Sequence, residues 1–188
     1  LSVPAYSDLP VPNHFLASLN TEDYDRLRPH LEAVALPSRL FLYEMGEPIE
    51  YCHFGDGGMT SLLIRLEDGA NIEAGVVGKE GFAGAAALMG VEDTSPYTSM
   101  IQMPGVGLRV GSGVLRTEML RRPALLDRVH RFTQALHTQI ATRSRRAHCR
   151  QSAPSSTSAA ASPCSTARGW KKARASATRL FGGIMNGF

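Results

Sequence analysis

The chain has 188 residues, of which 43 % are hydrophobic, and this suits one globular domain with a core. Its net charge of +3 conceals two unlike parts, because the last of the 17 acidic residues is Asp127 and only Lys and Arg carry charge beyond it. The three cysteines are too few for a disulfide framework. No signal peptide is evident, and no apolar run approaches the roughly 18 residues that span a bilayer, so we expect a cytoplasmic protein.

Residues 12–32 have the apolar spacing of two short helices. Asn20 or Thr21 is suited to cap the second of them, whose first turn carries acidic residues at the positive end of the helix dipole. Leu27 and Leu31 continue its apolar stripe at four-residue spacing. We expect these helices to lead into the main domain after an N-terminal arm of residues 1–11.

The pattern changes to short strands between Ala33 and Val110. Gly and Pro residues separate seven or eight strands of alternating polarity, at intervals of 8–12 residues that are typical of small antiparallel barrels and jelly rolls. Expected strands lie near Val34–Leu36, Leu40–Tyr43, Tyr51–His53, Ser61–Arg65, Asn71–Val77, Ser99–Met103 and Gly107–Val110. The fold class is therefore mainly β with flanking helices, in a domain that covers residues 12–122.

After Gly111 the pattern is helical again, and Pro123 suits the first turn of a longer helix over residues 123–142. Its apolar residues are Leu125, Val129, Phe132, Leu136 and Ile140. Part of this spacing follows the 3-4 alternation of a coiled-coil seam, so we expect these residues to form the interface of a homodimer. The alternative is that the stripe packs only against the chain's own barrel.

Three segments carry a resemblance to a known family. Leu40–Pro48, the Gly55–Gly58 turn and Gly75–Gly84, in this order and spacing, resemble the Crp/Fnr family of bacterial transcription regulators over residues 12–142. The resemblance implies a homodimer with a β-roll of the cyclic-nucleotide-binding type, a dimerisation helix, and a DNA-binding winged helix-turn-helix.

The family's effector cassette has a Glu just after a Gly and an Arg about ten residues later. The Arg matters because a buried phosphodiester needs a fixed cation. On this chain the Glu falls on Ala85 or Ala86 and the Arg near Pro96 or Tyr97, so we expect no cyclic nucleotide to bind in the usual way. The candidate ligand residues that this degenerate cassette still offers are Gly84, Ala85, Ala86, Leu88, Tyr97, Thr98 and Ser99. The effector itself stays unknown.

The sequence lacks the residue patterns of the family's other sensor chemistries and of known catalytic motifs. An iron–sulfur sensor needs several cysteines at a spacing that this chain lacks. A haem would need axial ligands in one pocket, but Cys52 and His53 are neighbours on a strand and point to opposite faces. No catalytic triad, P-loop or HExxH motif occurs, so we expect no metal, no cofactor and no enzymatic activity.

The segment 143–188 departs most from the family. It is rich in Ser, Ala, Pro and Thr, and no window has the apolar stripe of a recognition helix. We expect the helix-turn-helix to be missing or scrambled. The codons that can encode Gly169–Arg179, when they are read in a shifted frame, permit an amino-acid sequence that resembles the family's. The alternative is a functional regulator whose basic arm binds DNA phosphates, with a ligand- or partner-binding β-roll as a further alternative. The candidate nucleic-acid contacts are Arg143, Arg145, Arg146, Arg150, Lys171 and Lys172.

Overall fold

A computed structural model describes residues 13–66, 69–89 and 94–151, and of residues 144–151 it describes the backbone alone. The helical elements are α1 (His14–Ala17), α2 (Thr21–Leu27), the 3₁₀ helix η2 (Arg28–His30), α3 (Ala86–Met89), α4 (Ser112–Arg121) and α5 (Pro123–Gln151). The strands are β1 (Glu32–Leu36), β2 (Phe41–Tyr43), β3 (Tyr51–Asp56), β4 (Met59–Arg65), β5 (Asn71–Val77), β6 (Thr98–Met103) and β7 (Gly105–Gly111). This order of helices, strands and helices is the one that the sequence predicts.

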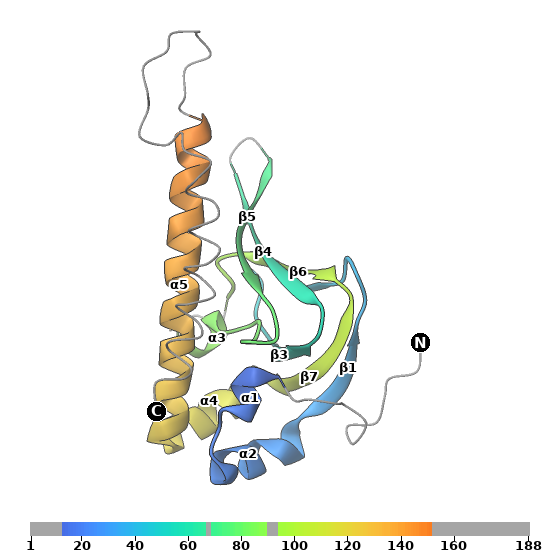
Figure 1. Cartoon of the computed structure of the whole chain (residues 1–188), viewed down its shortest axis with the longest axis vertical. Helices are drawn as coiled ribbons and strands as arrows, with labels where there is room; N and C mark the ends of the chain where they lie inside the picture. The colour runs from blue at the N-terminus through green and yellow to red at the C-terminus, as the bar shows by residue number, and fades with distance from the viewer. Residues whose placement is uncertain (1–12, 67–68, 90–93, 152–188) are drawn as a thin grey trace, which may run out of the picture.

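The strands form two antiparallel sheets, one with the order β1-β7-β3 and one with the order β2-β6-β4-β5. Together they make a roll, with α1, α2 and α4 gathered at one end and α5 running along its side next to β5 (Figure 1). The alternation of buried and exposed residues along the strands places one side of each strand in the core. The expectation of a mainly β domain with flanking helices is confirmed.

The two N-terminal helices are fastened by asparagine side chains. The Asn13 side chain accepts from the backbone N–H of Phe15, and its amide donates to the carbonyl oxygens of Gly55 at 2.9 Å and Gly81 at 2.7 Å. Asn20 caps α2 by accepting from the N–H of Asp23 at 2.8 Å, which satisfies a donor that the helix start would otherwise leave open. Of the two predicted caps, the structure selects Asn20.

An aromatic cluster joins the first helix, the roll and the last helix. Its members are Phe15 of α1, Phe54 of β3, Phe132 of α5, and Phe82 from the segment between β5 and α3. All four are at most 2 % exposed. Phe82 lies at the centre, with ring centroids 4.9 Å from Phe15, 4.9 Å from Phe54 and 4.8 Å from Phe132. Since buried aromatic rings contribute large apolar areas, this cluster fixes α5 to the β domain.

The apolar stripe of α5 faces this core, which favours packing on the roll over the predicted dimer seam. Leu125, Val129, Phe132 and Leu136 are each at most 2 % exposed within a single chain, and half-buried Ile140 packs against the same core. Side chains that are covered by their own β domain are not open to a second chain. The stripe packs on the roll, in agreement with the alternative hypothesis for the same spacing.

The helix α5 also runs beyond its predicted end at residue 142, as far as Gln151. The segment from 143 to 151 contains no Pro or Gly, and its Arg and Ala residues favour helix, so it continues α5. Arg143, a candidate contact to nucleic acid, donates to the Glu73 carboxylate on β5 at 2.7 Å and so forms an ion pair with the roll. Arg145, Arg146 and Arg150 lie on the helical backbone, while Lys171 and Lys172 lie outside the described residues.

Candidate functional site

The predicted effector cassette begins at Gly84, continues through α3 and ends where β6 begins. The structure brings Gly84, Tyr97 and Ser99 together around Tyr43 of β2, a residue that the sequence analysis did not select. The backbone N–H of Gly84 donates to the Tyr43 hydroxyl at 3.1 Å, and the Tyr43 and Tyr97 rings lie 6.4 Å apart. Ser99 is opposite Tyr43 in the strand register. Tyr43 thus occupies the centre of the candidate site.

The two tyrosines are buried and stay neutral. Tyr43 is 6 % exposed and Tyr97 is 4 % exposed. Burial disfavours the phenolate and raises the pKa of Tyr97 to about 12, and it raises the pKa of Tyr43 still further. Both side chains therefore act as apolar rings with a neutral hydroxyl.

The remaining cassette residues contribute packing. Ala85 and Leu88 are buried in the core, and Ala86 is half-buried against it. Thr98 accepts from the backbone N–H of Met45 at 3.1 Å, so its hydroxyl already bonds to the turn that follows β2. Of the seven candidate ligand residues, the structure brings Gly84, Tyr97 and Ser99 to one point and gives the others structural contacts.

A cation does reach the cassette, from a part of the sequence that the family pattern does not indicate. The Arg116 guanidinium on α4 donates to the carbonyl oxygen of Ala87 in α3. Its charge also acts on the Cys52 thiol, whose pKa is raised to about 12 because burial outweighs the effect of the guanidinium. Arg116 consequently joins α3 to α4 through a protein carbonyl.

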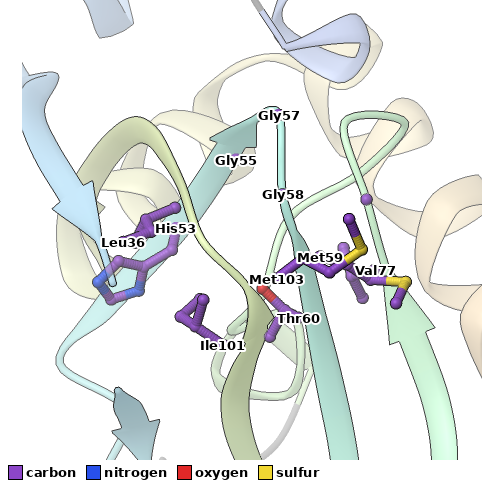
Figure 2. Close-up of a pocket in the computed structure, with 11 residues that line it drawn as sticks. Leu36, His53, Gly55, Gly57, Gly58, Met59, Thr60, Val77, Ile101 and Met103 are labelled. Carbon is purple, nitrogen blue, oxygen red and sulfur yellow. The ribbon is translucent and has the colours of Figure 1, made fainter. Parts of the chain in front are cut away.

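The backbone of His53 pairs with Ala83, just before the cassette, while its side chain lines a small cavity of about 10 Å³ next to Leu36 and Ile101 (Figure 2). This volume is close to the minimum for one water molecule. Burial, and then the neighbouring Arg109 charge, lower the pKa of His53 to about 4, so the ring is neutral near pH 7. Its Nδ1 atom has no hydrogen-bond partner among the described residues.

Neighbouring residues of β3 do point to opposite faces, as expected. The Cys52 thiol is buried against the carbonyl oxygen of Gly84 at 3.7 Å, whereas His53 faces the small cavity. A single iron between these two side chains is therefore inconsistent with the structure. Within residues 13–66, 69–89 and 94–143, whose side chains the structure describes, no three histidine, cysteine or carboxylate side chains gather closely enough to hold a metal ion.

The exposed face of α5 is polar and carries small residues. It presents Ala124, Asp127, Arg131, Gln134, Thr138 and Ala141. Asp127 and Arg131 pair at 2.7 Å, and the Thr138 hydroxyl donates to the carbonyl oxygen of Gln134. The sequence analysis missed this face because it has no apolar stripe.

No protein-family model matches the sequence, and no curated protein matches it. Solved structures do match. The N-terminal domain of a transcriptional regulator from Streptomyces coelicolor A3(2) is similar with a TM-score of 0.50 and 23 % identity, over 78 % of this chain and 96 % of that chain. The c-di-GMP responsive global regulator CLP of Xanthomonas campestris is similar with a TM-score of 0.53 and 17 % identity, over 88 % and 91 % of the two chains.

A third similar structure is the regulatory subunit of a cAMP-independent protein kinase A from Trypanosoma brucei, with a TM-score of 0.58 and 15 % identity. The match covers 69 % of this chain and 46 % of that one. At these identities the comparisons establish the fold, which is a β-roll of the cyclic-nucleotide-binding type with flanking helices, as the sequence predicts. Among the described residues, no helix combines the length and the apolar composition that a membrane crossing requires.

Proposed function

We propose that this chain is the sensory and dimerising part of a Crp/Fnr-type transcription regulator, and that its cassette does not bind a cyclic nucleotide. The family motifs in the sequence and the shared β-roll fold support the regulator role. The observation that carries the second part is the position of Tyr43. Its hydroxyl accepts the Gly84 N–H at the start of the cassette, and its ring stands with Tyr97 in the space beside it.

The absence of the family's Glu and Arg from the cassette also argues against binding of a cyclic nucleotide. The cassette has alanines where the family has its Glu, and its sequence holds no Arg between Arg65 and Arg109. A buried cyclic phosphate without a fixed cation would lose the charge-assisted hydrogen bonds that stabilise it. Arg116, the guanidinium that does approach the cassette, bonds to the carbonyl oxygen of Ala87.

Thermal unfolding in the presence of cyclic nucleotides tests this proposal. Because any ligand that binds only the native state raises its stability, millimolar cyclic AMP or cyclic GMP should leave the unfolding midpoint unchanged. AMP and GMP at the same ionic strength serve as controls for effects of the phosphate charge. A rise in the midpoint that is specific to a cyclic nucleotide would contradict the proposal.

DNA binding through the basic segment is a second candidate function. The observation that favours it is the continuation of α5 to Gln151, which places Arg145, Arg146 and Arg150 on one helical segment next to further basic sequence. Contacts to phosphates alone give binding that ignores sequence and weakens steeply with salt. Filter binding of labelled duplexes from 50 to 300 mM salt distinguishes the candidates, since operator-specific binding that survives competitor DNA requires an intact reader.

A further inference from the structure

A second cavity, remote from the cassette, opens between the α1–α2 connection and the start of α5. It has a volume of about 220 Å³ and is lined by Ser18, Leu19, Asn20, Asp23, Ala124 and Arg128. This is below the range of about 300–1,000 Å³ that is usual for pockets of drug-sized ligands. A small molecule or ion fits this volume.

The charges beside this cavity are balanced without Arg128. Arg122 donates to Asp23 at 2.7 Å and also to Glu22, and Arg26 donates to Glu118 at 2.7 Å. Arg121 pairs with Glu118 as well, at 3.3 Å. These three guanidinium groups face three carboxylates, so the cluster is neutral by itself.

Asp23 would repel an anion if its charge were open, but it is not. The side chain is 2 % exposed, and its two oxygens accept from Arg122 at 2.7 Å and from the Asn20 amide at 2.9 Å. Glu22, which shares Arg122, has a pKa below its usual value because of the hydrogen bond from that guanidinium. The acidic wall of the cavity is thus already compensated by the protein.

Arg128 is the surplus charge. It lies half-buried at the cavity and forms no hydrogen bond or ion pair with any residue that the structure describes. The nearest carboxylate on its own helix, Asp127, is paired with Arg131 at 2.7 Å. A guanidinium has five N–H donors in a planar fork that matches the oxygens of a carboxylate or phosphate.

We propose that the cavity between the α1–α2 connection and α5 binds a small oxyanion, a free phosphate or a small carboxylate, through Arg128. Ser18 and Asn20 also line the cavity as polar residues, and Leu19 and Ala124 line it as apolar ones; the Ser18 hydroxyl already donates to the carbonyl oxygen of Phe15 at 2.7 Å. The bound anion would join the N-terminal helices to the first turns of α5, next to the Arg122 ion pairs. This site is independent of the cassette and of any cyclic nucleotide.

Two variants of the full chain test this site. Arg128→Gln removes the surplus charge, and Arg131→Gln removes an equal charge one turn away on the exposed face of the same helix. Unfolding midpoints are measured with increasing sodium phosphate, and separately with sodium succinate, against sodium chloride at equal ionic strength. We expect at least one oxyanion to raise the midpoint of the wild type and of Arg131→Gln, with an apparent affinity at least tenfold weaker in Arg128→Gln.

The arms of the experiment identify the ligand class and can reject the site. A rise with phosphate alone indicates a phosphate site, and a rise with succinate alone indicates a carboxylate site. A midpoint that neither oxyanion changes overturns the proposal. An equal rise in Arg128→Gln also overturns it, since the anion would then bind elsewhere, for example at the basic residues beyond Asp127. Circular dichroism of Arg128→Gln, expected to match the wild type, shows that the variant is folded.

Discussion

At the scale of single residues, the hydroxyl of Tyr43 accepts the backbone N–H at the start of the predicted cassette. The donor to this hydroxyl, the N–H of Gly84, is buried in the core. Gly84 itself has a φ of 106°, where a Cβ would lie 3.0 Å from the carbonyl oxygen of Tyr51, so the backbone here suits glycine. The candidate site is therefore held in one conformation by the protein's own groups.

Tyr43→Phe tests this bond. The variant keeps the ring but leaves the buried N–H of Gly84 unsatisfied, so we expect a loss of about 1–3 kcal/mol in the free energy of unfolding. Urea denaturation measures it. Tyr51→Phe is the matched control, because the Tyr51 ring packs under Arg109 and its hydroxyl makes no hydrogen bond with the described residues, so a change below about 0.5 kcal/mol is expected. Equal losses in the two variants would show that the Tyr43 hydroxyl has no special role.

His53 makes a second prediction at this scale, on pH. Its pKa falls from 6.5 in the unfolded chain to about 4 in the folded one, because of burial and the Arg109 charge. Between these values the unfolded chain binds more protons, so stability increases with pH from about 4 to 6.5 and is lost as the pH falls. The full shift corresponds to at most about 3 kcal/mol.

Urea unfolding at pH 4.5, 5.5 and 7 compares the wild type with His53→Gln, which cannot gain a proton. We expect the difference in stability between the two proteins to shrink or reverse as the pH falls. A difference that stays constant across this range would show that His53 does not titrate as a buried group.

At the scale of elements, alternation and turn spacing predict the strands because both are local properties of the chain. The Gly57–Gly58 turn and the Pro123 helix start follow from the same kind of signal. The partner of α5 is not local: an amphipathic stripe shows that one face is buried, but a β-roll and a second helix bury the same spacing equally well. Tyr43 was missed for a similar reason, since its bond to Gly84 spans 41 positions of the sequence.

The contact between α5 and the roll also explains features of the sequence that the seam hypothesis could not. Gln139, which interrupts the apolar stripe, accepts from the N–H of Val76 on the edge strand β5 at 2.7 Å. At Gly81, a Cβ atom would come within 2.0 Å of the Phe132 ring. The glycine-rich family segment thus provides a close docking surface for α5.

Gly81→Ala tests this docking. The added methyl group overlaps Phe132 in a packed core, so we expect a destabilisation of about 1–3 kcal/mol, measured by urea denaturation. Gly113→Ala is the control, because a Cβ there meets nothing within 4 Å and the position is inside α4. Alanine should stabilise that helix by up to about 1 kcal/mol. A neutral Gly81→Ala would mean that α5 packs less tightly on the roll than the structure shows.

At the scale of the whole molecule, the β-roll uses one side of α5 and leaves the other side open. The aromatic cluster ties α5 to α1 and β3, while Arg143 and Gln139 tie it to β5 along the length of the roll (Figure 1). If the chain forms the homodimer that the family resemblance implies, the open face is the one available to the partner. The proposed interface therefore moves from the apolar stripe to the polar face of small residues.

Thr138→Glu tests the new assignment, because two glutamates facing each other across a two-fold axis would repel. We expect a dimer in the wild type and a monomer in the variant by light scattering, with the fold intact by circular dichroism. Thr117→Glu is a matched control, since Thr117 is also exposed and also donates to the carbonyl oxygen four residues earlier, at 2.8 Å against 2.9 Å for Thr138. Phe132→Asp, by contrast, buries an unpaired charge in the core and should unfold the chain. A dimer that persists in Thr138→Glu, or a folded monomer produced by Phe132→Asp, would return the interface to the apolar stripe.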